Sequence, residues 1–299
     1  MTGVEVLKIA DDELNLEYTL ASGQTFRWSR TDDGWWTGVV RGSVVCIRST
    51  KDGLEWQTYP EASNIGLVTD YFRLSEHVEA IYAQLARADR HTCEVVQRFR
   101  GLRLVNQEPH EALLSFVCSA ANSIPRISSS VERLSRHYGK PLALVHGAEY
   151  YSFPSVESLA SADPKEIEAI GGLGFRGRIL NSVANQILEQ PPGWLESLRH
   201  APYEEAKAQL VTLRGVGQKI ADCVCLFALG KDEAVPVDTH VRQLACRYYL
   251  CDLTAKTVTD SVYARVTDCL RHKFDGYAGW AQQFLFLEDL LRGKDEASR

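Results

Sequence analysis

The feature that most constrains the fold of this chain is a change in the spacing of its apolar residues near Ser75. Before that point, short β-branched and aromatic runs alternate with Gly, Ser and Asp, as in antiparallel strands joined by turns. After it, apolar residues recur at i, i+3 and i+4, which is the spacing of amphipathic helices. The sequence therefore predicts an α+β chain, with an N-terminal antiparallel β domain over residues 1–85 and a mostly α-helical domain over residues 86–299. The runs that predict strands are residues 17–23, 25–31, 35–42 and 43–50.

Prolines and glycines mark the ends of the predicted helices. Pro109 and Pro164 stand where a first-turn proline is tolerated, because the amide that proline lacks has no partner inside the helix there. Gly139 and Gly172 stand near helix C-termini, where glycine is favoured. We expect helices over residues 77–86, 110–120, 131–139, 163–172 and 204–213.

Charge and cysteine spacing narrow the class of protein. The net charge of −6 argues at first against a nucleic-acid partner. Residues 1–80, however, hold 13 acidic and 7 basic side chains, which accounts for the whole excess. None of the eight cysteines forms a CxxC pair, so a zinc ribbon and a thioredoxin-like site are excluded, and reduced thiols are expected.

No apolar run approaches the length of a membrane span, and the N-terminus lacks the basic and then apolar pattern of a secretory signal. We therefore expect no membrane contact and a cytoplasmic location in a prokaryote, or a nuclear one in a eukaryotic cell.

Two helical patterns, residues 201–213 and 218–229, are joined by a turn that contains Gly215 and Gly217. Glycine on both sides of one apolar residue permits positive φ and close approach by another molecule. The turn and the first amides of the second helix form an anion site that suits one DNA phosphate. Such a contact fixes register but carries no sequence information, and many helix hairpins need glycine only for their geometry.

Lys219 stands two places past this turn, at the start of an otherwise apolar helix. Apolar surroundings and the positive potential of a helix N-terminus both disfavour an ammonium ion, so they favour the neutral, nucleophilic amine. Cys223 lies at i+4 on the same face of the helix. Taken alone, Lys219 fits equally well as a surface lysine that binds phosphate as a point charge.

Asp238 opens another amphipathic helix after a strand-like apolar segment, residues 234–237. An aspartate at a helix N-cap is structural in most proteins. Fixed at a helix start, it can also face a cleft and stabilise a cation that develops beside it. Lys219 and Asp238 together supply an amine nucleophile and a carboxylate, which suffice to displace a base from a deoxyribose through an imine.

Residues 213–245 resemble the helix–hairpin–helix plus Gly/Pro-Asp segment of DNA glycosylases, and in particular that of the 8-oxoguanine DNA glycosylase/lyases. Together with four further segments, the resemblance covers most of the chain between residues 18 and 290. Five matches in the same order are a specific signal, whereas any one alone is weak. The four further segments, in chain order, are residues 22–28, 103–127, 172–179 and 277–286.

The resemblance implies a role for each residue of the site. Lys219 would attack C1′ and form a Schiff base, and Asp238 would stabilise the charged transition state. The damaged base would be flipped out of the duplex and held between Phe286 and Cys223, with Gln282 on its Watson–Crick edge. The carbonyl of Gly23 would accept a hydrogen bond from the N7–H that 8-oxoguanine has and guanine lacks.

The resemblance also implies a DNA interface around the pocket. Its members would contact phosphates, wedge into the duplex or read the opposite cytosine. Ala121 replaces an asparagine that reads cytosine in the family, Phe175 replaces a tyrosine wedge, and Arg214 replaces the hairpin proline. A preference for cytosine is therefore expected but in a relaxed form. The interface residues are Asn122, Arg126, Phe175, Arg176, Gly215, Gly217, Ile220 and His240.

Three alternatives compete with this interpretation. Endonuclease III-like glycosylases commonly carry a four-cysteine iron–sulfur cluster near the C-terminus, but no cysteine follows Cys269 here. A non-catalytic helix–hairpin–helix module would bind DNA in a salt-sensitive way without cleaving it, and would leave Lys219, Asp238 and Gln282 unexplained. A metal-dependent hydrolase finds no ligand pattern among the scattered histidines.

The sequence therefore predicts a bifunctional DNA glycosylase/AP lyase of base-excision repair that acts as a monomer. Its partner would be duplex DNA that contains 8-oxoguanine, opposite cytosine. No cofactor is expected apart from a monovalent or divalent cation at the hairpin, residues 213–220.

Overall fold

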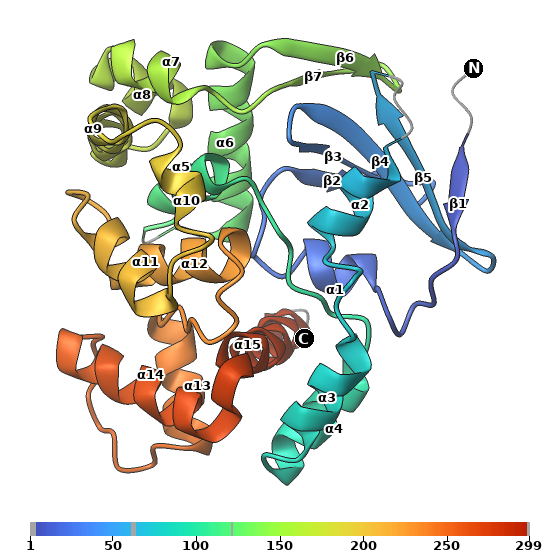
Figure 1. Cartoon of the computed structure of the whole chain (residues 1–299), viewed down its shortest axis with the longest axis vertical. Helices are drawn as coiled ribbons and strands as arrows, with labels where there is room; N and C mark the ends of the chain where they lie inside the picture. Colours follow the sequence, from blue (N-terminus) through green and yellow to red (C-terminus); the bar gives the residue numbers. More distant parts are fainter. Residues whose placement is uncertain (1–3, 61–63, 121, 298–299) are drawn as a thin grey trace.

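The computed structural model describes residues 4–60, 64–120 and 122–297. A five-stranded sheet forms one side of the molecule, and helices with one two-stranded hairpin form the rest (Figure 1). The strands are β1 (Glu5–Leu7), β2 (Trp28–Arg30), β3 (Trp36–Val40), β4 (Ser43–Thr50), β5 (Gly53–Tyr59), β6 (Pro141–Val145) and β7 (Ala148–Tyr151). The helices are α1 (Leu16–Leu20), α2 (Ile65–Tyr71), α3 (Val78–Ala86), α4 (Arg90–Arg98), α5 (Pro109–Val117), α6 (Ile124–Tyr138), α7 (Val156–Ser161), α8 (Pro164–Gly171), α9 (Arg176–Leu188), α10 (Trp194–Ser197), α11 (Tyr203–Val211), α12 (Gln218–Ala228), α13 (Thr239–Tyr248), α14 (Asp260–Phe274), the short 3-10 helix η1 (Asp275–Tyr277) and α15 (Ala278–Ala297).

The N-terminal sheet is antiparallel throughout, in the order β1-β5-β4-β3-β2. Because successive side chains of a strand point to opposite faces, β4 divides its apolar residues between two sides. Val45 and Ile47 join the main core, while Val44 and Cys46 join a small second cluster. The hairpin β6–β7 covers this second cluster, and it reaches the sheet across the top of Figure 1.

The sequence prediction for this region is confirmed for the sheet but wrong for residues 17–23. That run contains part of α1, which begins after the cap Asn15, whose side chain accepts from the amide of Tyr18 at 3.0 Å. The cap and a buried helical face outweigh the β propensity of the aromatic and β-branched residues. The strand-like segment 234–237 is likewise wrong as a strand, because it is irregular and buried.

The helix ends that were predicted from proline and glycine are confirmed. Pro109 and Pro164 open α5 and α8, and Gly139 and Gly172 follow α6 and α8 as caps. The hairpin is also confirmed, since α11 and α12 flank the turn at residues 214–217. The hairpin β6–β7 inside the helical part is not predicted by the sequence pattern.

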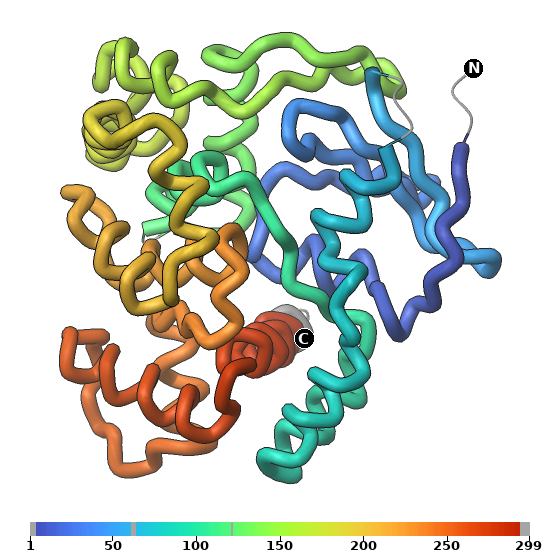
Figure 2. The backbone as a smooth tube through the Cα atoms, in the orientation of Figure 1, coloured from blue at the N-terminus to red at the C-terminus, as the bar shows by residue number. Residues whose placement is uncertain are grey.

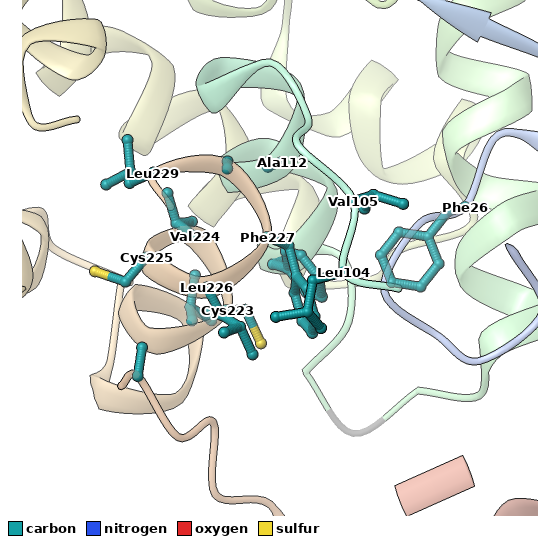
Figure 3. Close-up of a cluster of buried hydrophobic side chains, with 14 of the residues drawn as sticks. Phe26, Leu104, Val105, Ala112, Cys223, Val224, Cys225, Leu226, Phe227 and Leu229 are labelled. Atoms are coloured by element: carbon teal, nitrogen blue, oxygen red, sulfur yellow. The ribbon is translucent and has the colours of Figure 1, made fainter. Parts of the chain in front are cut away.

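One hydrophobic core runs from the sheet through the helices, with buried members from Leu14 to Leu287. Figure 3 shows side chains of α12 gathered beside Leu104, Val105 and Phe26, which all precede α5 in the chain. The tube in Figure 2 shows how the chain leaves the sheet through α2, α3 and α4 and then runs back toward α5. The predicted boundary between residues 85 and 86 falls in the last turn of α3, and the division there stays a prediction.

All eight cysteines are free thiols, as expected. Within the described ranges, no helix combines the length and the apolar character needed to cross a membrane.

Candidate active site

A cleft of about 870 Å³ opens where the N-termini of α12 and α13 meet α15 and the turn between α5 and α6. A smaller recess of about 60 Å³ adjoins it. The two cavities share five lining residues, so they form one continuous site. These are Gly23, Phe116, Lys219, Asp238 and Phe286.

Nine of the fourteen residues predicted from the sequence line these cavities. Seven line the cleft, and two more line only the recess. The other five lie outside both cavities, on the hairpin and at the start of α9. The cleft residues are Gly23, Asn122, Arg126, Lys219, Asp238, His240 and Phe286, the recess adds Cys223 and Gln282, and the remaining five are Phe175, Arg176, Gly215, Gly217 and Ile220.

Lys219 is half-buried at the start of α12, with its side chain in the cleft. Its amine nitrogen Nζ donates to Oγ of Ser119 at 3.0 Å and lies 5.6 Å from the centre of the Phe116 ring. The hydroxyl of Ser119 in turn donates to the carbonyl of Phe116 at 2.7 Å. Because that proton is committed, Ser119 can only accept from the amine, and the amine is held in one direction.

Asp238 is the N-cap of α13, as predicted, and its Oδ1 accepts from the amide of Val241 at 2.9 Å. This bond uses one carboxylate oxygen and fixes the side chain at the mouth of the recess, which Asp238 lines together with Lys219. The second oxygen is therefore available to a cation that develops in the same cavity.

Two residues give the recess its chemical character. Burial raises the pKa of the Cys223 thiol to about 12, so this side chain is a neutral, polarisable surface. Gln282 is 5% exposed, and its Oε1 has no hydrogen-bond partner in the part of the chain that the structure describes. A buried polar atom without a hydrogen-bond partner in the protein normally makes its hydrogen bond to water or to a ligand.

Gly23 also lines the recess. Hydrogen bonds hold the residues directly before and after it. The carbonyl of Ser22 accepts from Nε2 of Gln283 at 3.0 Å. Gln24 donates to the carbonyl of Arg103 at 2.8 Å. With φ at +79°, Gly23 adopts a backbone conformation that favours glycine, and a Cβ there would lie 2.8 Å from Ile124 and 3.6 Å from Phe286.

Phe286 lines both the recess and the cleft, and His240 lines the cleft. The two rings meet edge to face with centroids 6.2 Å apart. His240 is exposed, and its Nδ1 lies 3.7 Å from Oδ2 of Asp289 on α15. Because His240 follows Asp238 by two residues, these contacts also tie the start of α13 to α15.

The two glycines of the hairpin have different roles. Gly215 has φ at +105°, and a Cβ there would lie 2.4 Å from Ile179, so glycine is needed to pack the turn against α9. Gly217, the N-cap of α12, has open space on its Cβ side and no side-chain cap. Gly217 is therefore the position that lets a ligand reach the first amides of the helix, which include that of Ile220.

The remaining predicted residues lie around the rim. Arg126 is exposed at the cleft, and the Nδ2 of Asn122 donates to the carbonyl of Cys118 at 3.3 Å. Phe175 is 66% exposed beside the guanidinium of Arg176, which lies 5.1 Å from its ring centre. The expectation about Ala121 falls outside the described residues.

Some residues of the site carry no local signal in the sequence. Ser119 and Phe116 reach Lys219 from α5 and the turn after it, a hundred residues earlier in the chain. Asp222, by contrast, could be noticed, because it is a charged residue inside an apolar helix. Among the described residues, no group of three or more His, Cys, Asp or Glu side chains is arranged to hold a metal ion.

The fold and the site define the class of protein: a helix–hairpin–helix DNA glycosylase with a lysine and an aspartate in one cleft. Residues 6–113 match the family model for the 8-oxoguanine DNA glycosylase N-terminal domain, and residues 114–267 match that for the HhH-GPD superfamily of base excision DNA repair proteins. The chain belongs to the 8-oxoguanine DNA glycosylase family and is an enzyme.

Relatives of known name agree with this assignment. The chain is 34% identical to the N-glycosylase/DNA lyase OGG1 of Arabidopsis thaliana, over 95% of this chain and 80% of that protein. It is 30% identical to the N-glycosylase/DNA lyase of Saccharomyces cerevisiae, over 95% and 85%. It is also similar to the crystal structure of the Clostridium acetobutylicum 8-oxoguanine glycosylase/lyase in complex with duplex DNA that contains cytosine opposite 8-oxoguanine. That match has a TM-score of 0.87 and 29% identity, and it covers 98% of each chain.

Proposed function

We propose that this enzyme excises 8-oxoguanine from duplex DNA and then cleaves the strand at the abasic site. The observation that carries the proposal is the presence of the Lys219 amine and the Asp238 carboxylate in one cleft, beside a recess lined by Gly23 and Gln282. The named activities of the relatives and the DNA complex of the Clostridium acetobutylicum enzyme support it.

The recess would receive the flipped base. Phe286 and the neutral thiol of Cys223 offer two apolar surfaces for stacking, and the free Oε1 of Gln282 offers an acceptor for the base edge. The carbonyl of Gly23 would discriminate the oxidised base, because N7 of guanine is itself an acceptor and two acceptors repel. The recess of about 60 Å³ opens into the cleft of about 870 Å³, through which the base would enter.

Lys219 would be the nucleophile. Attack of its neutral amine on C1′ forms a C–N bond as the bond from C1′ to the base breaks, and the base leaves with a proton. Opening of the sugar then gives a Schiff base at C1′. Removal of a proton from C2′ expels the 3′ phosphate by β-elimination, and water releases the lysine. The contact with Ser119 holds one N–H of the amine and so restricts the rotation of the amino group.

Asp238 would stabilise the positive charge that grows on the sugar as the base departs. A carboxylate fixed in a partly buried site costs little reorganisation when that charge appears. Its capping bond to Val241 supplies this fixed position.

The rim would hold the DNA. Phe175 is exposed enough to act as the wedge, and Arg126, Arg176 and Asn122 would face the cytosine opposite the lesion. The hairpin and His240 would contact phosphates, which gives salt-dependent binding. The enzyme would act as a monomer.

A cation at residues 213–220 is part of the same proposal. This segment contains no carboxylate, so backbone carbonyls would be its ligands, which suits a weakly held hard cation. The exposed Gly217 leaves room for a phosphate beside it.

The experiment is a comparison of duplexes that differ in one base. Single-turnover excision is measured on duplexes with 8-oxoguanine opposite cytosine, 8-oxoguanine opposite adenine, and thymine glycol. Rapid release of 8-oxoguanine opposite cytosine, with slower release opposite adenine, supports the proposal. Preferred release of thymine glycol would contradict it.

A further inference from the structure

A fully buried carboxylate, Asp222, lies on α12 between Lys219 and Cys223 and does not line the cleft. Its Oδ1 accepts from the hydroxyl of Tyr203 at 2.7 Å. Its Oδ2 accepts from Nζ of Lys207 at 2.8 Å and from the hydroxyl of Tyr263 at 2.5 Å. Removing a charged side chain from water is costly, so a carboxylate in this place calls for an explanation beyond packing.

Tyr263 connects this carboxylate to the segment that carries Asp238. Its hydroxyl accepts from the amide of Val237 at 3.3 Å and lies 3.2 Å from the carbonyl of Val235. The hydroxyl has one proton, and the shorter contact assigns that proton to Asp222. The hydroxyl oxygen is then free to accept from Val237, which is the residue directly before Asp238.

The helix that carries Lys219 is therefore joined by a short chain of hydrogen bonds to the segment that carries Asp238. Asp222 is three residues after Lys219 on the same rigid helix, and Val237 is one residue before Asp238. Tyr263 links the two through its single hydroxyl. The segment 235–238 is irregular, so no strand or helix of its own fixes its distance from α12.

We propose that Tyr263 is a positioning residue that sets the placement of the Asp238 carboxylate relative to the Lys219 amine. The inference rests on the proposed function for the reaction that it serves. Loss of the hydroxyl leaves the buried amide of Val237 without its acceptor, so the segment must shift to find another. Shifts of about 1 Å at a reacting centre can cost about a hundredfold in rate.

The structure supplies a matched control in Tyr203. Its hydroxyl also donates to Asp222 and also accepts one N–H, which comes from Lys207 instead of Val237. The two tyrosines are equally buried, at 4% exposure each. Tyr203→Phe and Tyr263→Phe therefore remove the same atom, and each removes one bond to Asp222 and one accepted N–H. Only Tyr263→Phe releases the segment before Asp238, where it also removes the contact with the carbonyl of Val235.

Single-turnover excision on a duplex with 8-oxoguanine opposite cytosine is measured for both variants, with thermal unfolding and with affinity for a duplex that carries a stable abasic-site analogue. We expect Tyr263→Phe to lower the excision rate by about tenfold to a hundredfold, with affinity within about twofold of the wild type. Tyr203→Phe should keep its rate within about threefold while losing similar thermal stability. Equal rate losses in the two variants would overturn the inference, because they would indicate a general structural role.

A double-mutant cycle with Asp238→Asn separates positioning from packing. If Tyr263 acts through the carboxylate of Asp238, Tyr263→Phe should change the slow rate of Asp238→Asn by less than about twofold. If Tyr263→Phe lowers the excision rate of Asp238→Asn by the same factor as it lowers that of the wild type, the hydroxyl acts independently of Asp238. That result would refute the inference.

Amide hydrogen exchange tests the contact between Tyr263 and Val237 without a substrate. Exchange at Val237 should be faster in Tyr263→Phe than in Tyr203→Phe and the wild type, because only that variant frees the amide. A wild-type enzyme inactive on 8-oxoguanine would contradict the proposed function, and the exchange comparison would then decide this inference by itself. Equal exchange in both variants would refute it.

Discussion

Replacing Gly23 with alanine is expected to separate the stability of the loop from its role in catalysis. At φ of +79°, an alanine costs about 1–2 kcal/mol of backbone strain. The new Cβ would lie 2.8 Å from Cδ1 of Ile124, which is the flexible end of a side chain and can move aside at little cost. The free energy of unfolding should therefore fall by about 1–2 kcal/mol, which lowers Tm by a few degrees.

The effect on excision should be much larger than the effect on stability. The same Cβ would lie 3.6 Å from Cε1 of Phe286, so it would occupy the side of the recess where the base must enter. We expect a loss of about a hundredfold in the single-turnover rate, because the carbonyl of Gly23 and the ring of Phe286 would no longer hold the base in its reactive position.

Gly34 is the control for this substitution. Its φ is +86°, and open space surrounds its Cβ position, so Gly34→Ala carries similar strain in the turn between β2 and β3, which lines neither the cleft nor the recess. Thermal unfolding and single-turnover excision are measured on both variants. Wild-type excision by Gly23→Ala, or an equal loss in Gly34→Ala, would refute the assignment of Gly23 to the base recess.

Three further outcomes are expected. Ser119→Ala removes the acceptor that directs the nucleophilic amine, so single-turnover excision should fall about tenfold with unchanged DNA affinity, and an unchanged rate would contradict that role. Burial raises the pKa of Cys223 to about 12, so iodoacetamide followed by mass spectrometry should label the exposed Cys251 first, and early labelling of Cys223 would contradict a neutral buried thiol. Burial lowers the pKa of His110, but the hydrogen bond and charge of Glu108 raise it by more, so the net folded-state pKa is raised. This pair therefore stabilises the fold below about pH 6.5 and loses its effect as pH rises through the folded-state value. His110→Gln should destabilise the protein more at about pH 6 than at about pH 8.5 in urea unfolding, and a larger loss at the higher pH would contradict the sign.

Local rules were sufficient for the elements whose ends carry their own signal. Asp238 caps α13 through a bond to an amide three residues away, and Pro164 and Gly172 bound α8. Residues 17–23 show the limit of those rules, since Tyr18 and Thr19 favour a strand by propensity while a cap at Asn15 starts a helix. The hairpin β6–β7 could not be predicted from the local sequence. Its apolar residues, such as Val145, are buried by packing on a sheet whose strands are distant in the sequence.

The residues of the site also fall into two groups, those with a signal in the local sequence and those that depend on tertiary packing. Lys219 could be noticed because a lysine at the start of an apolar helix is unusual, whereas Asp238 is a common kind of N-cap and gained its significance only beside Lys219 and the family resemblance. Ser119 could not be found, because its contact with the amine depends on how α5 packs against α12. The bridge through Tyr263 also has no signal in the sequence, since it joins α14, α12 and the irregular segment before Asp238, which are far apart along the chain.

The central claim is that Lys219 forms a covalent intermediate with the sugar of the damaged nucleotide. Borohydride trapping on a duplex with one 8-oxoguanine opposite cytosine tests it, with wild type, Lys219→Gln and an undamaged duplex compared side by side. We expect an adduct between the wild-type protein and the damaged strand only, absent in Lys219→Gln. An adduct of equal yield in Lys219→Gln, or no adduct despite release of the base by the wild type, would contradict the claim.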